Sequence, residues 1–132
     1  MAKVLALDFG AARTGVAVSD PTGTLARPLG VVERAADTGL DDLLELIRTE
    51  APERVVVGLP LTLRGAVGEQ ARVTEEFVAA LRGRVEVPVE TYDERFTTAL
   101  AGQSGGHSDE DARAAAHLLT GYLARTEAAR RA

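Results

Sequence analysis

The sequence predicts an α/β fold in which helices cover a single mixed sheet. The first quarter of the chain holds β-type apolar runs separated by turn residues, with no helical pattern between them. The rest of the chain alternates helical periodicity with short apolar runs. Strands joined by tight turns pair in antiparallel fashion, whereas strands joined through a helix pair in parallel. We therefore expect a three-stranded antiparallel meander followed by parallel strands flanked by helices.

The meander accounts for the first three predicted strands. Residues 4–9 and 14–20 form two of them around the segment GAART, in which Gly10 and Gly15 permit a tight reversal. The turn DPTG leads into LARPLGVVE, where Pro28 restricts the third strand to a sheet edge or a bulge. Both alternating residue sets of VLALDF are apolar, so the first strand should be central and covered on both faces.

Helical spacing then alternates with further strands. The segment TGLDDLLELIRTE predicts a helix whose apolar face is formed by Leu40, Leu43, Leu44 and Ile47. RVVVGLP follows as a short buried strand closed by Pro60. GEQARVTEEFVAALRG predicts a second helix that stops at Gly83, and VEVPVETYDE supplies another β-rich run. A last helix should begin near Ser108 and contain DARAAAHLLTGYLAR.

Composition limits the class of protein. A chain of 132 residues, 45% of them hydrophobic, suits one domain, which we place at residues 1–126, with residues 127–132 as a C-terminal tail. The chain lacks cysteine, a basic leader with an apolar core and an apolar run near the ~20 residues of a membrane span, so we expect a cytoplasmic protein without membrane contact. The net charge of −5 argues against a protein that coats nucleic acid electrostatically.

The first candidate site residue is Asp8, which ends the first apolar strand. An unpaired charge at the margin of a core is costly, so this carboxylate should be solvated, paired or held against a cation. The alternative is a turn residue whose carboxylate accepts hydrogen bonds from the amides of FGA.

A second acid follows the β-rich run VPVETYDE. Strict alternation places Asp93 on the face of Val89, and Glu94 on the face of Tyr92. We expect Asp93 to be the inward residue, with Glu94 as the alternative if the strand ends before it.

The last helix offers the third acid. Asp111 shares the apolar stripe of Ala115, Leu118 and Tyr122, the stripe that must face the sheet. A structural explanation also exists, because Ser108 at the N-cap and an acid three residues later form a variant of the capping box.

Four segments in this order carry a family resemblance. ALDFGAARTGVAVSD, VVVGLPLTLRGAVGEQA, VETYDERFTT and DARAAAHLLTGYL resemble the YqgF (RuvX) family of Holliday-junction-resolvase-like nucleases over nearly the whole chain. The resemblance implies an RNase H-like fold in which strand-end acids and an acid of the last helix bind divalent cations. On this chain the implied catalytic and metal-binding residues are Asp8, Asp93 (with Glu94 as the alternate acid) and Asp111. Such oxygen ligands suit Mg²⁺ or Mn²⁺ in a two-metal site.

The resemblance also implies a function. Family members are regarded as nucleases that mature the precursor of the small-subunit ribosomal RNA, so we expect a metal-dependent endonuclease in the 5′-end maturation of pre-16S rRNA. The alternatives are a Holliday-junction resolvase acting on branched DNA, and a non-catalytic binding module of a ribosomal or transcription complex. A homodimer would suit symmetric cutting of a four-way junction, whereas a monomer suffices for one RNA end.

Several arginines are candidates for nucleic-acid contacts. Arg13 and Arg95 either hold a phosphate or act as counter-ions of the acids, and Arg64 either contacts a backbone phosphate or lies in a plain surface loop. The loop ALAGQSGGHSDED departs from the family, whose members usually carry a longer segment with several basic residues here, and this weakens the case for binding at the loop. Other basic residues that would supply a rim are Arg72, Arg82 and Arg84.

Overall fold

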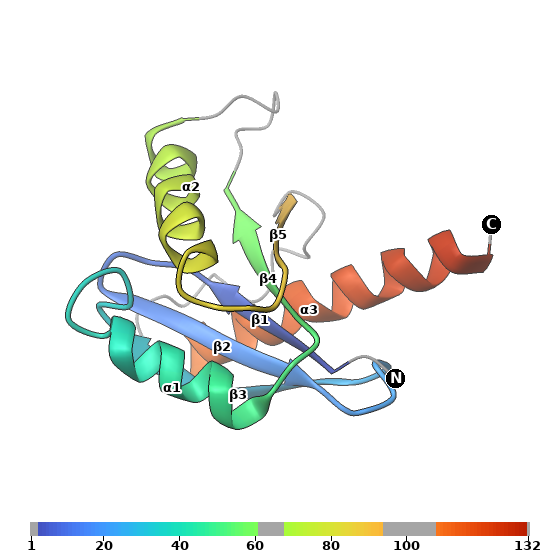
Figure 1. Cartoon of the computed structure of the whole chain (residues 1–132). Coiled ribbons are helices and arrows are strands. Elements are labelled where there is room, and N and C mark those ends of the chain that lie inside the picture. The colour runs from blue at the N-terminus through green and yellow to red at the C-terminus, as the bar shows by residue number, and fades with distance from the viewer. Residues whose placement is uncertain (1–2, 61–67, 94–107, 132) are drawn as a thin grey trace.

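The computed structural model of the chain describes residues 3–60, 68–93 and 108–131 (Figure 1). The elements are, in chain order, β1 (Val4–Asp8), β2 (Arg13–Ser19), β3 (Ala26–Glu33), α1 (Leu40–Glu50), β4 (Arg54–Leu59), α2 (Glu69–Arg82), β5 (Val89–Asp93) and α3 (Ser108–Arg131). This order is the predicted one, with three consecutive strands followed by strands that alternate with helices.

The strands form one five-stranded mixed sheet in the order β3-β2-β1-β4-β5. β2 pairs in antiparallel fashion with β1 and β3, and β4 pairs in parallel with β1 and β5. The predicted meander and the parallel strands are therefore both confirmed, and β1 lies at the centre of the sheet. α1 and α2 cover one face, and α3 crosses the other face (Figure 1).

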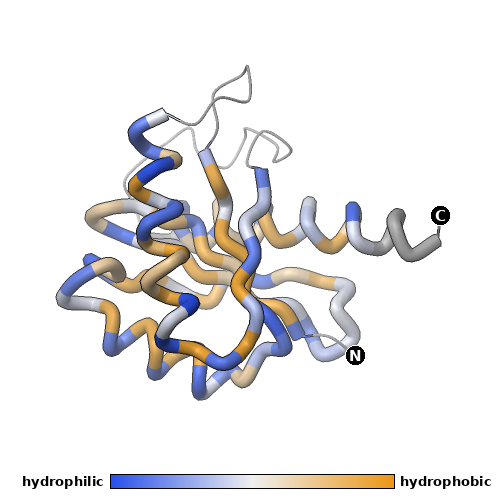
Figure 2. Tube along the Cα trace, turned by 45° about the horizontal axis from the view of Figure 1, so that its top comes forward, coloured by the Kyte–Doolittle hydropathy of each residue, from blue (hydrophilic) through white to orange (hydrophobic). Residues whose placement is uncertain are grey.

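The two faces of the sheet carry separate apolar clusters, which explains why β1 is apolar throughout. Leu5 and Leu7 pack in the cluster beneath α1 and α2, whereas Val4 and Ala6 pack in the cluster beneath α3. Figure 2 shows the resulting hydrophobic strands and the alternation of hydrophilic and hydrophobic residues along α2. Because both faces of β1 are buried, apolar and polar residues do not alternate along it, as expected for a central strand.

The edge strand β3 carries the irregularity expected from its proline. The register passes from Val16 opposite Gly30 to Ala17 opposite Pro28, so Leu29 is bulged out of the ladder. A proline cannot donate a ladder hydrogen bond, and an edge strand with a bulge is where this is tolerated. The expectation for Pro28 is confirmed.

Two boundaries differ from the sequence pattern. β5 begins only at Val89, so residues 85–88 connect α2 to the sheet without being part of the strand. Pro88 lacks a backbone N–H and cannot extend the ladder in the usual way. α3 has 24 residues and continues to Arg131, so the helix includes residues 127–131 of the predicted C-terminal tail.

None of the described helices combines enough length with enough hydropathy to cross a membrane.

The turn after β2 is organised by Asp20. Its carboxylate accepts hydrogen bonds from the Thr22 hydroxyl at 2.7 Å and from the backbone amides of Thr24 at 2.8 Å and Leu25 at 3.1 Å. The Thr22 hydrogen bond, followed by those from the two amides, lowers the pKa of Asp20 below its usual value. The carboxylate therefore stabilises the turn in its ionised form.

Asp20→Ala should lower the free energy of unfolding at neutral pH and make the stability less sensitive to acid. Because the folded-state pKa is lowered, the contribution of Asp20 is present above the unfolded pKa of about 4 and is lost as the pH falls through the folded value. Urea unfolding of both proteins at neutral pH and in acid measures this. A stability difference that stays constant across that window contradicts the assignment.

Candidate active site

Asp8 lies at the centre of the sheet, at the carboxyl end of β1. It is half-buried and stands opposite Gly15 of β2 in the antiparallel register. Because side chains alternate along a strand, Asp8 shares the face of Val4 and Ala6, which pack against α3. The carboxylate is thus directed toward the side of the sheet that α3 covers.

Gly15 lets the last helix touch the sheet beside Asp8. A Cβ placed on this glycine would lie well inside 3.0 Å of the Asp111 carbonyl oxygen and 3.1 Å from the amide nitrogen of Ala112. The first turn of α3 therefore sits directly on the backbone of β2, where no side chain fits. The sequence pattern assigned Gly15 to chain reversal, whereas its structural role is this close approach.

Asp111 lies in that first turn, on the stripe that faces the sheet. The stripe is confirmed because Ala115, Leu118 and Tyr122 below it are all buried. The carboxylate oxygen Oδ2 of Asp111 accepts a hydrogen bond from Nε of Arg13 at 2.8 Å. Asp8 and Asp111 are thus brought to either side of Gly15, and Arg13 is a counter-ion of Asp111.

Asp93 lies at the end of β5, farther from Asp8 than Asp111 is, because β4 separates β5 from β1. It stands opposite Leu59 of β4, and its backbone lies about two strand spacings, roughly 10 Å, from β1. Val89 packs beneath α1 and α2, whereas Tyr92 packs against α3. Because side chains alternate along the strand, Asp93 lies on the face of Val89, which is the opposite face of the sheet from Asp8. Glu94 lies outside the described residues.

The oxygen donors suit a hard divalent cation. Across the described parts of the chain, no three acidic or histidine side chains are close enough to hold a metal ion on their own. Mg²⁺ does not require such a cage, since it commonly binds one or two carboxylates and fills its octahedron with water and substrate phosphate. Oε2 of Glu110, which precedes Asp111, is buried and has no hydrogen-bond partner among the described residues.

A polar and aromatic network joins α3 to β4 and β5. The Tyr122 hydroxyl donates to Glu90 at 3.0 Å, and its ring meets that of Tyr92 edge-on with 5.7 Å between centroids. The guanidinium of Arg54 lies 5.8 Å from the Tyr122 ring centroid. Burial raises the pKa of Tyr92, and nearby Arg125 opposes this. Sequence reasoning missed this network, although Glu90 and Tyr92 share one strand face.

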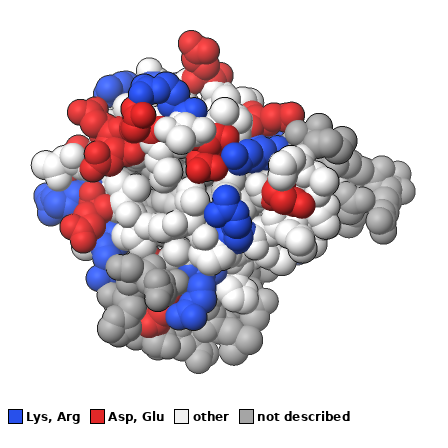
Figure 3. Space-filling view, turned by 90° about the horizontal axis from the view of Figure 1, so that it is seen from below, with Lys and Arg blue, Asp and Glu red and all other residues white. Residues whose placement is uncertain are grey.

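Among the described residues, the basic side chains predicted to supply a rim lie at the two ends of α2 and do not form one continuous surface. Arg72 pairs with Glu69, Arg82 donates to the Val89 carbonyl at 2.8 and 2.9 Å, and Arg84 lies beyond the end of α2. Arg64 and Arg95 lie outside the described residues. Figure 3 shows acidic and basic side chains interspersed over the face it presents. Of the predicted nucleic-acid contacts, Arg13 is therefore the one that the described structure places beside a candidate acid.

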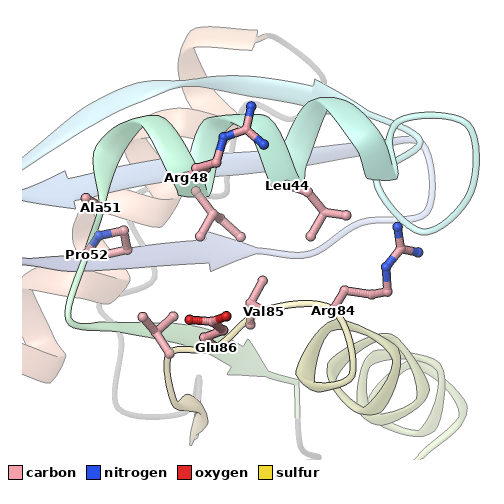
Figure 4. Close-up of a pocket in the computed structure, with 9 residues that line it drawn as sticks. Leu44, Arg48, Ala51, Pro52, Arg84, Val85 and Glu86 are labelled. Carbon is pink, nitrogen blue, oxygen red and sulfur yellow. The ribbon is translucent and has the colours of Figure 1, made fainter.

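A pocket lies at the opposite end of the sheet from Asp8. Its volume is about 500 Å³, and it is formed by the end of α1 and the connection between α2 and β5. Leu44 and Val85 point toward one another across it, and the guanidinium groups of Arg48 and Arg84 lie at its rim (Figure 4). Of the candidate acids that the structure describes, Asp8, Asp93 and Asp111, none lines this pocket.

The sequence model of the RuvX family, described as Holliday junction resolvase, matches residues 2–125. The chain belongs to the RuvX family. A protein of Rubrobacter xylanophilus named "Putative pre-16S rRNA nuclease" is 46% identical over 92% of this chain and 91% of its own length. A protein of Moorella thermoacetica with the same name is 38% identical over 93% of this chain and 95% of its own length.

Solved structures support the fold of this RuvX-family protein. RuvC of Thermus thermophilus, in complex with a Holliday junction substrate, superposes with a TM-score of 0.60 at 20% identity, covering 96% of this chain and 97% of that one. At this identity the likeness concerns the fold alone. It confirms the RNase H-like mixed sheet predicted from the family motifs.

Proposed function

We propose that this RuvX-family protein is a divalent-metal-dependent endonuclease that hydrolyses phosphodiester bonds during 5′-end maturation of pre-16S rRNA. The observation that carries the proposal is the meeting of Asp8 and Asp111 around Gly15. Asp8 comes from the first strand and Asp111 from the last helix, so two acids distant in sequence converge at the carboxyl end of the central strand β1. The names of the curated relatives support the choice of substrate.

The carboxylates would hold the cation at the carboxyl end of the central strand. A bound Mg²⁺ or Mn²⁺ supplies charge stabilisation for the attacking and leaving oxygens of phosphodiester hydrolysis. Asp8 is the central ligand in this proposal, Asp111 lies on its α3 side, and an acid at the end of β5 provides the third carboxylate. Two ions held by these acids would give the two-metal arrangement expected from the family.

The helices add a field that favours a polyanion. α1 and α2 begin at the same end of the sheet as the carboxyl end of β1, and the first turn of α3 rests on Gly15 there (Figure 1). The positive ends of the helix dipoles therefore point toward the proposed site, where they would stabilise the negative charge of a backbone phosphate. Arg13 adds a full positive charge at the same place.

Mutation can decide whether Asp93 or Glu94 supplies the third carboxylate. We expect Glu94→Gln to reduce cleavage by about 10²-fold and Asp93→Asn by less than about tenfold, because Asp93 shares the face of Val89 and not that of Asp8. Single-turnover cleavage rates at saturating Mn²⁺ measure both. The reverse ranking assigns the ligand to Asp93 and contradicts the alternation argument.

Cleavage of two substrates tests the proposal. We expect an end-labelled pre-16S rRNA fragment with its 5′ extension to be cut in Mn²⁺ or Mg²⁺ and left intact in chelator. A synthetic four-way DNA junction, tested alongside because the family model is described as a Holliday junction resolvase, should be cut more slowly. Preferential cutting of the junction would move the substrate to branched DNA. Binding of either substrate without cutting would favour a non-catalytic module.

A further inference from the structure

The ion pair between Arg13 and Asp111 differs from the local ion pairs of the helices and turns. It joins the first residue of β2 to the first turn of α3, 98 residues later in the chain. The side chains of Arg13 and Asp111 are 35% and 27% exposed, whereas the pairs made by Arg34, Arg48 and Arg72 join residues three apart, all of them more than half exposed. Exposed pairs of that kind contribute little to stability. The Arg13 pair is better shielded and lies at the proposed site.

The packing of α3 already has other causes, so the pair is not needed to hold the helix in place. The first turn of the helix lies on the bare backbone of Gly15, and Ala112, Ala115 and Leu118 are buried beneath it. The backbone position of Asp111 is set by these contacts. What Arg13 adds is a positive charge at the carboxylate, in the place where a metal ligand would need a cation.

We propose that Arg13 is an exchangeable counter-ion of the site. It neutralises Asp111 when no cation is bound, and it gives up that carboxylate to the incoming divalent ion. The proposal rests on the proposed function, since it requires Asp111 to be a metal ligand. A guanidinium remains charged at any relevant pH, so it competes with a cation for the same oxygen and does not leave by deprotonation.

The released guanidinium remains close to the substrate. About a third of the Arg13 side chain is already exposed, so the group can turn toward solvent without unfolding any element. Arginine binds phosphate through paired, charge-assisted hydrogen bonds. Arg13 thus passes from Asp111 to a backbone phosphate as the cation binds, which couples metal binding to substrate binding.

Metal affinity distinguishes a competing cation from a structural brace. We would titrate the whole protein with Mn²⁺ by isothermal calorimetry, comparing wild type with Arg13→Met, Arg13→Lys and a control, Arg48→Met. Removing a competitor should tighten Mn²⁺ binding by at least about fivefold, with Arg13→Lys between Arg13→Met and wild type. Arg48→Met makes the same change in net charge at an exposed helix pair, and should stay within about twofold because remote surface charges are screened.

Stability without metal gives a second readout. In chelator, Arg13→Met should unfold at a lower temperature than wild type, because Asp111 loses its counter-ion, and saturating Mn²⁺ should remove most of that difference. Mn²⁺ affinity that is unchanged or weaker in Arg13→Met overturns the proposal. If wild type still cleaves its substrate in that case, the nuclease function stands and only the counter-ion role falls. If no variant binds Mn²⁺, both the counter-ion role and the metal site fall.

Discussion

Asp8→Asn should lower the rate of metal-dependent cleavage by at least about 10³-fold while leaving the fold intact. A bound cation contributes several kcal/mol to the stabilisation of the transition state, and each 1.4 kcal/mol lost is about a tenfold loss of rate. Asparagine keeps the shape of the side chain and removes the charge that would hold the ion. Asp8 is half-buried at the end of the central strand, so no other described acid takes the same place.

The matched control for this change is Glu53→Gln. Glu53 is an exposed acid directly before β4, which runs parallel to β1, so it lies at the end of the sheet opposite to Asp8. Its substitution changes the net charge by the same amount and should leave the cleavage rate within about twofold. Circular dichroism and urea unfolding of each variant establish that the fold is kept. An Asp8→Asn protein that cuts within tenfold of wild type would show that Asp8 is not a ligand.

Gly15→Ala should be the most destabilising small substitution in the described sheet. The added methyl would overlap the carbonyl oxygen of Asp111, and the neighbouring atoms are helix backbone, which cannot move aside by a change of rotamer. Overpacking a closed interface costs about 1–3 kcal/mol, occasionally more, and a backbone clash belongs at the upper end, so we expect a loss of about 3 kcal/mol. The first turn of α3 must shift, which also moves Asp111 away from Asp8.

Gly30→Ala provides the comparison within the same sheet. A Cβ at Gly30 would meet no atom within 4 Å, so alanine there should be neutral or stabilise by up to about 1 kcal/mol through the reduced freedom of the unfolded chain. Urea unfolding of the two variants measures the difference. Equal stabilities would mean that α3 does not rest on β2 as described, and the convergence of Asp8 and Asp111 would lose its structural basis.

The parts of the fold that followed from the sequence are those set by local periodicity. The apolar residues of VLALD on both alternating faces implied a central strand, and β1 is central. Pro28 implied an edge or bulge, and β3 has both. The stripe below Asp111 implied which face of the last helix is buried. In each case one residue pattern has only one arrangement that buries its apolar atoms and satisfies its backbone.

The parts that did not follow depend on contacts between distant elements. The same pattern that permits a turn at Gly15 also permits a helix to lie on it, and only the docking of α3 separates the two roles. Alternation assigns Asp93 to the face of Val89, but both faces of the sheet are covered, so an inward side chain can belong to either face. The partner of Arg13 was left open for the same reason, and the structure supplies Asp111.

The most direct test of the site is the position of a bound metal. We would grow crystals of the protein with Mn²⁺ and locate the ion by its anomalous scattering, using Asp111→Asn crystals as the control. We expect a peak between the carboxylates of Asp8 and Asp111, beside Gly15, which is lost or much weaker in the control. A Mn²⁺ peak elsewhere, or one that survives unchanged in Asp111→Asn, would contradict the proposed site.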